Sequence, residues 1–255
     1  MANLNIVDGT VLVIRPWFGG HAEPWRIAMA QLRGHAREST HLAVVMDLTL
    51  DTFRREIDPR YKVHRPPAPP ELIASFDRFR DEAQALGVPV LGSTRYEADD
   101  VSATLVRLAR AADLPVSILS DDKDLFQLVA DQPRVWVEDR MRGKLYNTEA
   151  VVEKLGVRPD QVVDYLSLVG DASDGVHGVA GVGAKTAAEL LRALGSLDAI
   201  YADLDAVGKL PLRGASGLVA KLRAGREAAM LARELVRLRD DVPVPDNVLE
   251  LARRR

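Results

Sequence analysis

Cysteine is missing from all 255 residues, so the chain has neither disulfides nor thiolate metal sites. No stretch approaches the ~20 consecutive apolar residues that a membrane-spanning helix needs. The N-terminal "MANLNIVDG" lacks the basic start and long apolar run of a signal peptide. A basic excess is also missing, since 34 lysines and arginines face 37 acids for a net charge of −3. These absences favour the cytoplasm, indicate no membrane partner and argue against a protein that simply coats nucleic acid.

Short apolar strands alternate with helices over the first half of the sequence. The strands read "LNIVD", "HLAVVMD", "VPVLGS" and "LPVSILS". Such alternation predicts an α/β fold with a mainly parallel central sheet flanked by helices. The pattern then changes to helices around the glycine-rich "DASDGVHGVAGVG". We therefore expect an α/β core over residues 1–150 and a helical region over 151–255 packed on it.

Three of the apolar strands run directly into carboxylates. Asp8 follows "NIV", Asp47 follows "LAVVM" and Asp122 follows "VSIL". Because functional sites of parallel sheets form outside the carboxyl ends of the strands, these acids are expected to meet at one edge. Each acid alone has a structural explanation; Asp99 and Asp100, for example, suit a helix N-terminus. Clustering and strand-end placement together favour a functional site.

The chemistry of the clustered acids indicates a divalent metal. Oxygen ligands with neither cysteine nor histidine beside them suit Mg²⁺ or Mn²⁺ rather than zinc. More acids than one ion needs suggest two ions, the arrangement used for phosphodiester cleavage. An EF-hand is excluded because "DDKDLFQLVADQ" lacks the central glycine and the terminal glutamate.

The glycine-rich loop "GVAGVGAKT", residues 178–186, is not a P-loop. Its lysine does not directly follow a glycine, and no buried strand precedes it. A helix–hairpin–helix-like loop fits better, because glycines allow close approach to a phosphate and the next helix offers its free N–H groups. The alternative is a plain helix-capping loop. The expected DNA-binding residues are Gly178, Gly181, Gly183, Lys185 and Thr186.

Five ordered motifs support a family assignment. They read "VDG", "VVMDLTLDTFRREIDPRYKVHR", "YEADDV", "SDDKDLFQLV" and "GDASDGVHGVAGVGAKTAAELL". Over residues 4–245 the chain resembles the 5′-nuclease superfamily, which includes the nuclease domain of bacterial DNA polymerase I, phage 5′-exonucleases and flap endonucleases.

This resemblance assigns roles residue by residue. It implies a first metal group of Asp8, Asp47, Glu97, Asp99 and Asp122, with Asp100 beside it. It implies a second metal group of Asp124, Asp171 and Asp174. Lys62 and Arg65 correspond to a basic pair over the scissile phosphate, where cations offset developing charge. It further implies a helical arch near residues 66–95, a helix–three-turn–helix over 159–194, and K⁺ held by backbone carbonyls near Val169, Val179 and Val182.

The implied activity is that of a stand-alone structure-dependent 5′-nuclease, because no polymerase sequence follows Arg255. Such an enzyme combines 5′–3′ exonuclease and flap endonuclease activity, uses two Mg²⁺ ions for which Mn²⁺ substitutes, and leaves 5′-phosphate and 3′-hydroxyl ends. The expected partners are DNA with 5′ flaps, nicks or 5′ ends, and RNA-primed duplex. We expect a monomer that acts in replication or repair.

Some positions depart from the family pattern. The segment between Asp8 and Asp47 looks short, and Asp121, Gly175 and His177 stand where other residues are common. Two rival functions remain. A PIN-like ribonuclease would share the acids but lack the arch and the helix–hairpin–helix. A non-catalytic DNA-structure-binding protein would gain nothing from acids that repel phosphates.

Overall fold

The computed structural model describes residues 2–139, 142–211 and 215–253, which form two compact units. Unit 1 comprises Met1–Phe53, Arg65–Asn147 and Leu238–Arg255, and unit 2 comprises Arg54–His64 and Thr148–Arg237. The division expected at residue 150 rested on a change of sequence pattern. Such a change does not reveal that short segments from each half belong to the other unit. Among these residues, no helix combines the length and the apolar character that crossing a bilayer requires.

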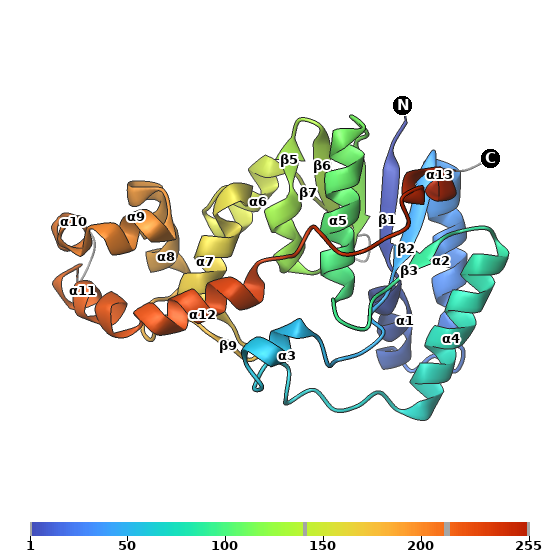
Figure 1. Ribbon diagram of the computed structural model, residues 1–255, viewed down its shortest axis with the longest axis horizontal. Coiled ribbons are helices and arrows are strands. Elements are labelled where there is room, and N and C mark those ends of the chain that lie inside the picture. The colour runs from blue at the N-terminus through green and yellow to red at the C-terminus, as the bar shows by residue number, and fades with distance from the viewer. Residues whose placement is uncertain (1, 140–141, 212–214, 254–255) are drawn as a thin grey trace. The chain divides into compact units, whose positions relative to one another are not determined.

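Unit 1 is built on a seven-stranded sheet in the order β3–β2–β1–β4–β6–β5, with β7 also paired to β6 (Figure 1). The pairs among β1, β2, β3, β4 and β6 are parallel, whereas β5 and β7 pair antiparallel with β6. The mainly parallel α/β prediction is therefore confirmed. The strands are β1 (Leu4–Asp8), β2 (His41–Val45), β3 (Val90–Leu91), β4 (Val116–Leu119), β5 (Ala130–Asp131), β6 (Arg134–Asp139) and β7 (Lys144–Tyr146).

The strand register brings the carboxyl ends of the central strands to one edge. Asp8 of β1 pairs with Val45 of β2, and Val7 pairs with Leu119 of β4. Residues that follow β2 and β4 therefore emerge beside Asp8. This edge is the one expected to carry a site in a parallel sheet.

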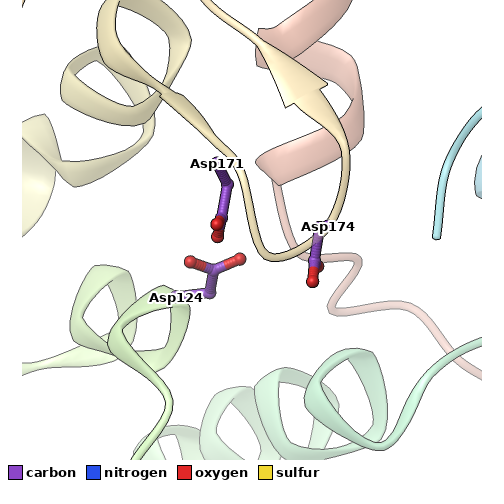
Figure 2. A group of neighbouring side chains, drawn as sticks. All are labelled: Asp124, Asp171 and Asp174. Atoms are coloured by element: carbon purple, nitrogen blue, oxygen red, sulfur yellow. The ribbon is translucent and has the colours of Figure 1, made fainter. Parts of the chain in front are cut away.

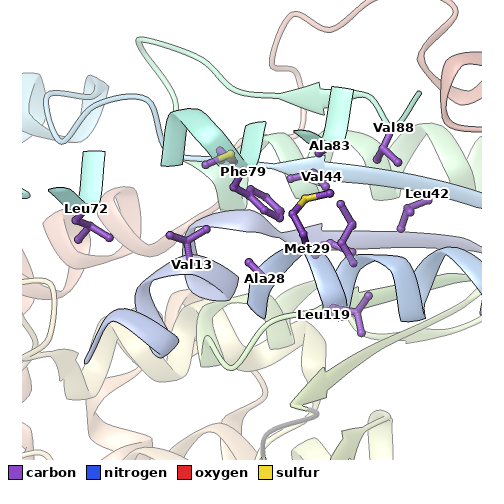
Figure 3. Packing of buried hydrophobic residues seen from close by; sticks show 13 residues of the cluster. Val13, Ala28, Met29, Leu42, Val44, Leu72, Phe79, Ala83, Val88 and Leu119 are labelled. Carbon is purple, nitrogen blue, oxygen red and sulfur yellow. The ribbon is translucent and has the colours of Figure 1, made fainter. Parts of the chain in front are cut away.

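The helices of unit 1 cover both faces of the sheet. On one face, α1, α2 and α4 bury an apolar cluster that includes Met29, Val44 and Phe79 (Figure 3). On the other face, α5 contacts β1, β2 and β4. The elements are α1 (Gly9–Phe18), α2 (Pro24–Glu38), α4 (Pro70–Ala85), α5 (Ala98–Ala111), the 3₁₀ helix η1 (Lys123–Leu128) and α13 (Val248–Ala252).

The segment expected to resemble an arch, residues 66–95, contains α4 and β3. Residues 66–69 are not helical, because their prolines fix φ and remove N–H donors. The helix that follows buries Leu72, Phe79 and Ala83 in the core of unit 1, so apolar packing holds that side of α4. Guidance of a single strand by this segment stays a prediction.

Unit 2 consists of short helices and one two-stranded ribbon. Helix α7 packs against α8 and α12, and β8 pairs antiparallel with β9. The helix α3 (Phe53–Ile57) belongs to this unit after its first residue. The other elements are α6 (Thr148–Leu155), η2 (Pro159–Gln161), α7 (Val162–Val169), β8 (Gly170–Asp171), β9 (Val176–His177), α8 (Ala184–Leu194), α9 (Leu197–Ala202), α10 (Leu204–Lys209), α11 (Ala215–Ala224) and α12 (Arg226–Val236).

Candidate metal and nucleic-acid site

Asp8 is a buried carboxylate at the carboxyl end of β1, with only 6% of its surface exposed. It accepts hydrogen bonds from the Val11 N–H (2.9 Å) and the Ser120 hydroxyl (3.0 Å). The pKa of Asp8 is raised to about 7, chiefly by burial and also by the charges of Asp47 and Asp122, against the two hydrogen bonds that lower it. The sheet thus brings Asp8, Asp47 and Asp122 into electrostatic reach of one another, as the strand-end pattern predicts.

Asp47 connects the sheet edge to the N-terminus of α5. Its Oδ1 accepts the Ala98 N–H at 2.9 Å, and its own N–H donates to the Thr10 hydroxyl at 2.9 Å. Because Ala98 lies between Glu97 and Asp99, this bond places both acids beside the same edge. Glu97 is buried as the N-cap of α5, and Asp47 is exposed.

Asp100 has a structural task at this edge. Its side chain is fully buried, and its two carboxylate oxygens accept the N–H groups of Glu97 (3.0 Å) and Arg239 (2.8 Å). These bonds fix the first turn of α5 and anchor the C-terminal segment of unit 1. A place for Asp100 beside a metal ion stays a prediction.

Asp122 and Asp124 lie at the start of η1. Asp122 caps this helix by accepting the Asp124 N–H at 2.9 Å, and the Ser120 hydroxyl accepts the Asp122 N–H at 3.3 Å. The side chain of Asp124 is only 13% exposed. Among the described acids of unit 1, no three carboxylates come within 4.8 Å of one another. The acids of the first metal group therefore lie at one edge of the sheet, but their carboxylate oxygens are farther apart than the ligands of a single ion.

Asp121 forms ion pairs with arginines, which indicates a different role from that of Asp122. Its carboxylate pairs with Arg15 and lies 3.8 Å from the guanidinium of Arg142. Arg15 and Arg142 also pair with the buried Asp139. Burial acts to raise the pKa of Asp139, but the hydrogen bonds from Arg142 and the charge of Arg15 hold it below the ordinary value. The extra acid in "SDDKD" therefore belongs to an ion-pair network.

In unit 2, Asp171 and Asp174 lie close together around the turn between β8 and β9. Each offers a carboxylate oxygen within 4.8 Å of the other, and both residues are buried (Figure 2). Asp171 accepts the N–H and the hydroxyl of Ser173. The turn also explains Gly175, whose φ of +74° is a left-handed conformation that favours glycine. His177 lies exposed on β9.

Lys62 contacts Asp174 within unit 2. Its Nζ lies 3.4 Å from Asp174 Oδ2, and its N–H donates to the Asp174 carbonyl at 2.9 Å. The Tyr61 hydroxyl donates to the same Oδ2 at 2.9 Å. One carboxylate is thus held by two consecutive residues. Arg65, the other member of the expected basic pair, is an exposed residue of unit 1.

Lys62 has a left-handed backbone with φ of +52°. Since this conformation is unfavourable for a residue with a Cβ, we expect Lys62→Gly to be more stable to urea than Lys62→Ala by about 1 kcal/mol. Both variants lose the same ion pair, so the comparison isolates the backbone. Equal unfolding free energies would show that the left-handed turn is not maintained in solution.

Three glycines of the glycine-rich loop of unit 2 have different surroundings. A Cβ on Gly178 would lie 2.4 Å from the Gly170 nitrogen and the Leu168 carbonyl oxygen, so Gly178 permits a close backbone crossing. Gly181 has φ of +76°, whereas a Cβ on Gly183 would meet nothing within 4 Å. Gly183 stands directly before α8, and in the first turn of that helix Lys185 is exposed and Thr186 is half-buried. DNA binding by this loop stays a prediction.

The residues expected to offer carbonyls to K⁺ lie around the same loop. Val169 ends α7, the Val179 N–H donates to the Leu168 carbonyl, and the Val182 N–H donates to the Val179 carbonyl at 3.0 Å. The Val179 carbonyl already has one partner in the turn. The K⁺ site therefore stays a prediction.

Three residues that hold the acids in place were not singled out from the sequence. Ser120 bridges Asp8 and Asp122, Thr10 holds Asp47, and Tyr61 holds Asp174. Ser120 and Tyr61 directly precede motif residues, which was a usable signal. Thr10 directly follows the motif "VDG" and offered the same signal, but no sequence pattern names its partner Asp47. A mainly parallel α/β sheet with a carboxylate-lined carboxyl edge, in a chain with a helical unit and a glycine-rich turn, is the arrangement expected of an α/β protein with a metal-ion site at that edge.

Two family models account for nearly the whole chain. The model described as "5'-3' exonuclease, N-terminal resolvase-like domain" matches residues 3–156. The model described as "5'-3' exonuclease, C-terminal SAM fold" matches residues 157–255. The chain therefore belongs to the 5′-3′ exonuclease family, and the superfamily predicted from the five motifs is confirmed.

Individual relatives agree with this assignment. DNA polymerase I of Pseudomonas aeruginosa is 43% identical over 201 residues, which are 78% of this chain and 22% of that protein. The chain thus spans about a fifth of the length of the curated relatives it matches.

Solved structures agree with the fold over almost the whole chain. The D15 protein of bacteriophage T5, co-crystallised with metal ions, has a TM-score of 0.77 and 25% identity, covering 98% of this chain and 92% of that one. The T5 D15 flap endonuclease in a pseudo-enzyme-product complex with DNA and metal ions has a TM-score of 0.73 and 25% identity, with the same coverage.

Proposed function

We propose that this chain is a structure-dependent 5′-nuclease, acting as a 5′–3′ exonuclease and flap endonuclease on DNA in replication or repair. The observation that carries the proposal is Asp8, a buried carboxylate whose pKa is raised to about 7 beside Asp47 and Asp122. A strongly perturbed acid at the carboxyl edge of a parallel sheet is typical of a functional site. Support also comes from the two exonuclease family models and from the T5 proteins, whose structures contain metal ions and DNA.

The donor set fits Mg²⁺, with Mn²⁺ as a substitute, because it offers carboxylate oxygens and no sulfur. Asp8, Asp47, Glu97, Asp99 and Asp122 would hold one ion, with Asp100 fixing the helix behind them. Asp124, Asp171 and Asp174 would hold the other. Divalent ions supply a lowered pKa for an attacking water and offset the charge of the phosphate.

The other residues bind and orient the substrate in this proposal. Lys62 and Arg65 contact the scissile phosphate, where two cations stabilise the developing charge. The loop at Gly181–Thr186 and the N-terminus of α8 hold duplex backbone without reading bases. Hydrolysis leaves a 5′-phosphate and a 3′-hydroxyl. Candidate substrates are DNA with 5′ flaps, nicks or 5′ ends, and RNA-primed duplex.

Cleavage of end-labelled substrates tests the function directly. We expect a 5′-flap DNA to be cut in Mg²⁺ or Mn²⁺ and to remain intact in EDTA. Cleavage that survives EDTA would contradict the metal requirement. Preference for an RNA hairpin over the flap would favour a PIN-like ribonuclease. Flap binding in EDTA without cleavage in Mg²⁺ would favour a non-catalytic binder.

Lys185 provides a separate test of the duplex contact. We expect Lys185→Ala to weaken duplex binding and to make the slope of log K against log salt shallower by about 1, since one phosphate contact is lost. Fluorescence anisotropy at several salt concentrations measures both quantities. The exposed Lys144→Ala of unit 1 is the control. An unchanged slope would remove Lys185 from the phosphate contacts.

A further inference from the structure

Arg55 bonds to both carbonyls that bracket Lys62. Its Nε donates to the Tyr61 carbonyl at 3.2 Å and its Nη2 donates to the Lys62 carbonyl at 3.3 Å. Lys62 is the residue with the left-handed φ of +52°. A planar guanidinium is suited to this task, because its fork fixes two acceptors at once.

The other contacts of this segment fix its two ends. The neighbouring Arg54 is buried and donates to the Leu235 carbonyl at 2.7 Å, which ties α3 to the end of α12. At the far end, the Lys62 N–H donates to the Asp174 carbonyl, and the His64 ring lies 3.1 Å from the Ser173 carbonyl. Arg55 therefore connects α3, which Arg54 anchors to α12, with the turn at Tyr61 and Lys62.

An unfavourable backbone conformation persists only where the surroundings over-determine it. If the two bracketing carbonyls lose their common donor, Lys62 can relax to a right-handed or extended conformation. That change redirects the whole side chain, whose Nζ otherwise lies 3.4 Å from Asp174 Oδ2. The guanidinium of Arg55 thus sets the direction of Lys62 through the backbone.

From these contacts we propose that Arg55 is a positioning residue of the nuclease reaction, which holds Lys62 in its left-handed turn and so aims Nζ at the Asp174 side of the site. The proposal rests on the proposed nuclease function, because the role of Lys62 at the phosphate does. Arg55 itself contacts neither substrate nor metal ligand in this role. Its effect is transmitted by the two carbonyls alone.

Single-turnover cleavage of a 5′-flap DNA tests the catalytic part. We expect Arg55→Gln to lower the rate by about 10- to 100-fold with a nearly unchanged flap Kd, since misplacing a group by an ångström has effects of that size. Arg55→Lys should recover only part of the rate. Arg60→Gln is the charge-matched control, because Arg60 bonds to the Asp58 carboxylate instead, and its rate should be unchanged within about 2-fold.

A double-mutant cycle separates positioning from general structural damage. In a Lys62→Ala background, Arg55→Gln should change the rate by no more than about 2-fold, because the group it positions is already gone. A loss of the same size in both backgrounds would overturn the proposal.

Amide hydrogen exchange tests the conformational part without any nuclease activity. In Arg55→Gln the Lys62 amide should exchange about 10-fold faster or more, while the amides of β1 keep their rates. Unchanged exchange at Lys62 would overturn the proposal. If the unsubstituted chain cuts no DNA, the proposed function fails, and the exchange experiment still decides whether Arg55 holds the turn.

Discussion

Asp8→Asn is expected to make the metal-free protein more stable while abolishing most of its nuclease activity. The stability gain follows from the pKa of Asp8, which burial raises from 3.8 to about 7. The folded state therefore binds the proton more tightly than the unfolded state does. Protonated Asp8 therefore contributes to the free energy of unfolding. This contribution is fully present below pH 3.8 and is lost as the pH rises to 7. An ionised Asp8 costs the fold on the order of 4 kcal/mol above pH 7.

Asparagine removes that loss because it is neutral at every pH. Its Oδ1 can accept the Val11 N–H, and the Ser120 hydroxyl can rotate to accept from its amide, so both neighbours keep a partner. In EDTA, the stability gain over the unsubstituted chain should therefore grow between pH 4 and pH 7 and stay constant above. Urea unfolding at several pH values measures this gain.

A divalent cation should reverse part of the stability gain of Asp8→Asn over the unsubstituted chain. An ion that binds the folded state stabilises the unsubstituted chain by mass action, and Asp8→Asn loses one of its ligands. Flap cleavage in Mg²⁺ should fall by at least about 10²-fold. The exposed Asp246→Asn is the matched control and should change neither quantity. A variant that is less stable than the unsubstituted chain at pH 8 in EDTA would contradict a strained, buried carboxylate.

The sheet and its acidic edge could be predicted because one physical rule covers them. Apolar runs that end in acids, placed in parallel strands, bring Asp8, Asp47 and Asp122 to one edge whatever the loops do. The hydrogen bond between Asp100 and the C-terminal segment could not be predicted in this way. Its partner Arg239 is 139 residues away, and only the tertiary fold brings that N–H to the carboxylate.

The turn at Lys62 shows a second limit. The motif "YKVHR" indicates a basic loop, but residue type alone does not reveal a left-handed lysine, since glycine and asparagine are the residues that usually adopt that conformation. The turn exists because Arg55 and Asp174 supply bonds from outside it. Likewise, the motif "SDDKD" assigns Asp122 to the first metal group and marks Asp121 as a departure, but it does not reveal that Arg15 pairs with Asp121.

Gly178→Ala is expected to have the largest effect on the stability of unit 2. Alanine there would place its Cβ 2.4 Å from backbone atoms of Leu168 and Gly170, and backbone cannot move aside as a flexible side chain can. Gly170, whose backbone crosses that of Gly178, itself has φ of +76°, so its conformation leaves little freedom to move away. We expect a loss of about 3 kcal/mol, at the upper end of the range for overpacking, together with loss of duplex binding.

Gly183→Ala is the matched control because the added methyl group meets nothing within 4 Å and φ is −95°. Its unfolding free energy should stay within about 1 kcal/mol of the unsubstituted chain, because alanine is only a poorer N-cap for α8 than glycine. Because Asp171 follows Gly170 directly, displacement of the crossing should also shift the β8–β9 turn and lower flap cleavage in Gly178→Ala. Urea unfolding and cleavage measured on both variants decide the matter. Equal stability of the two variants would mean that the crossing at Gly178 is looser than 2.4 Å in solution.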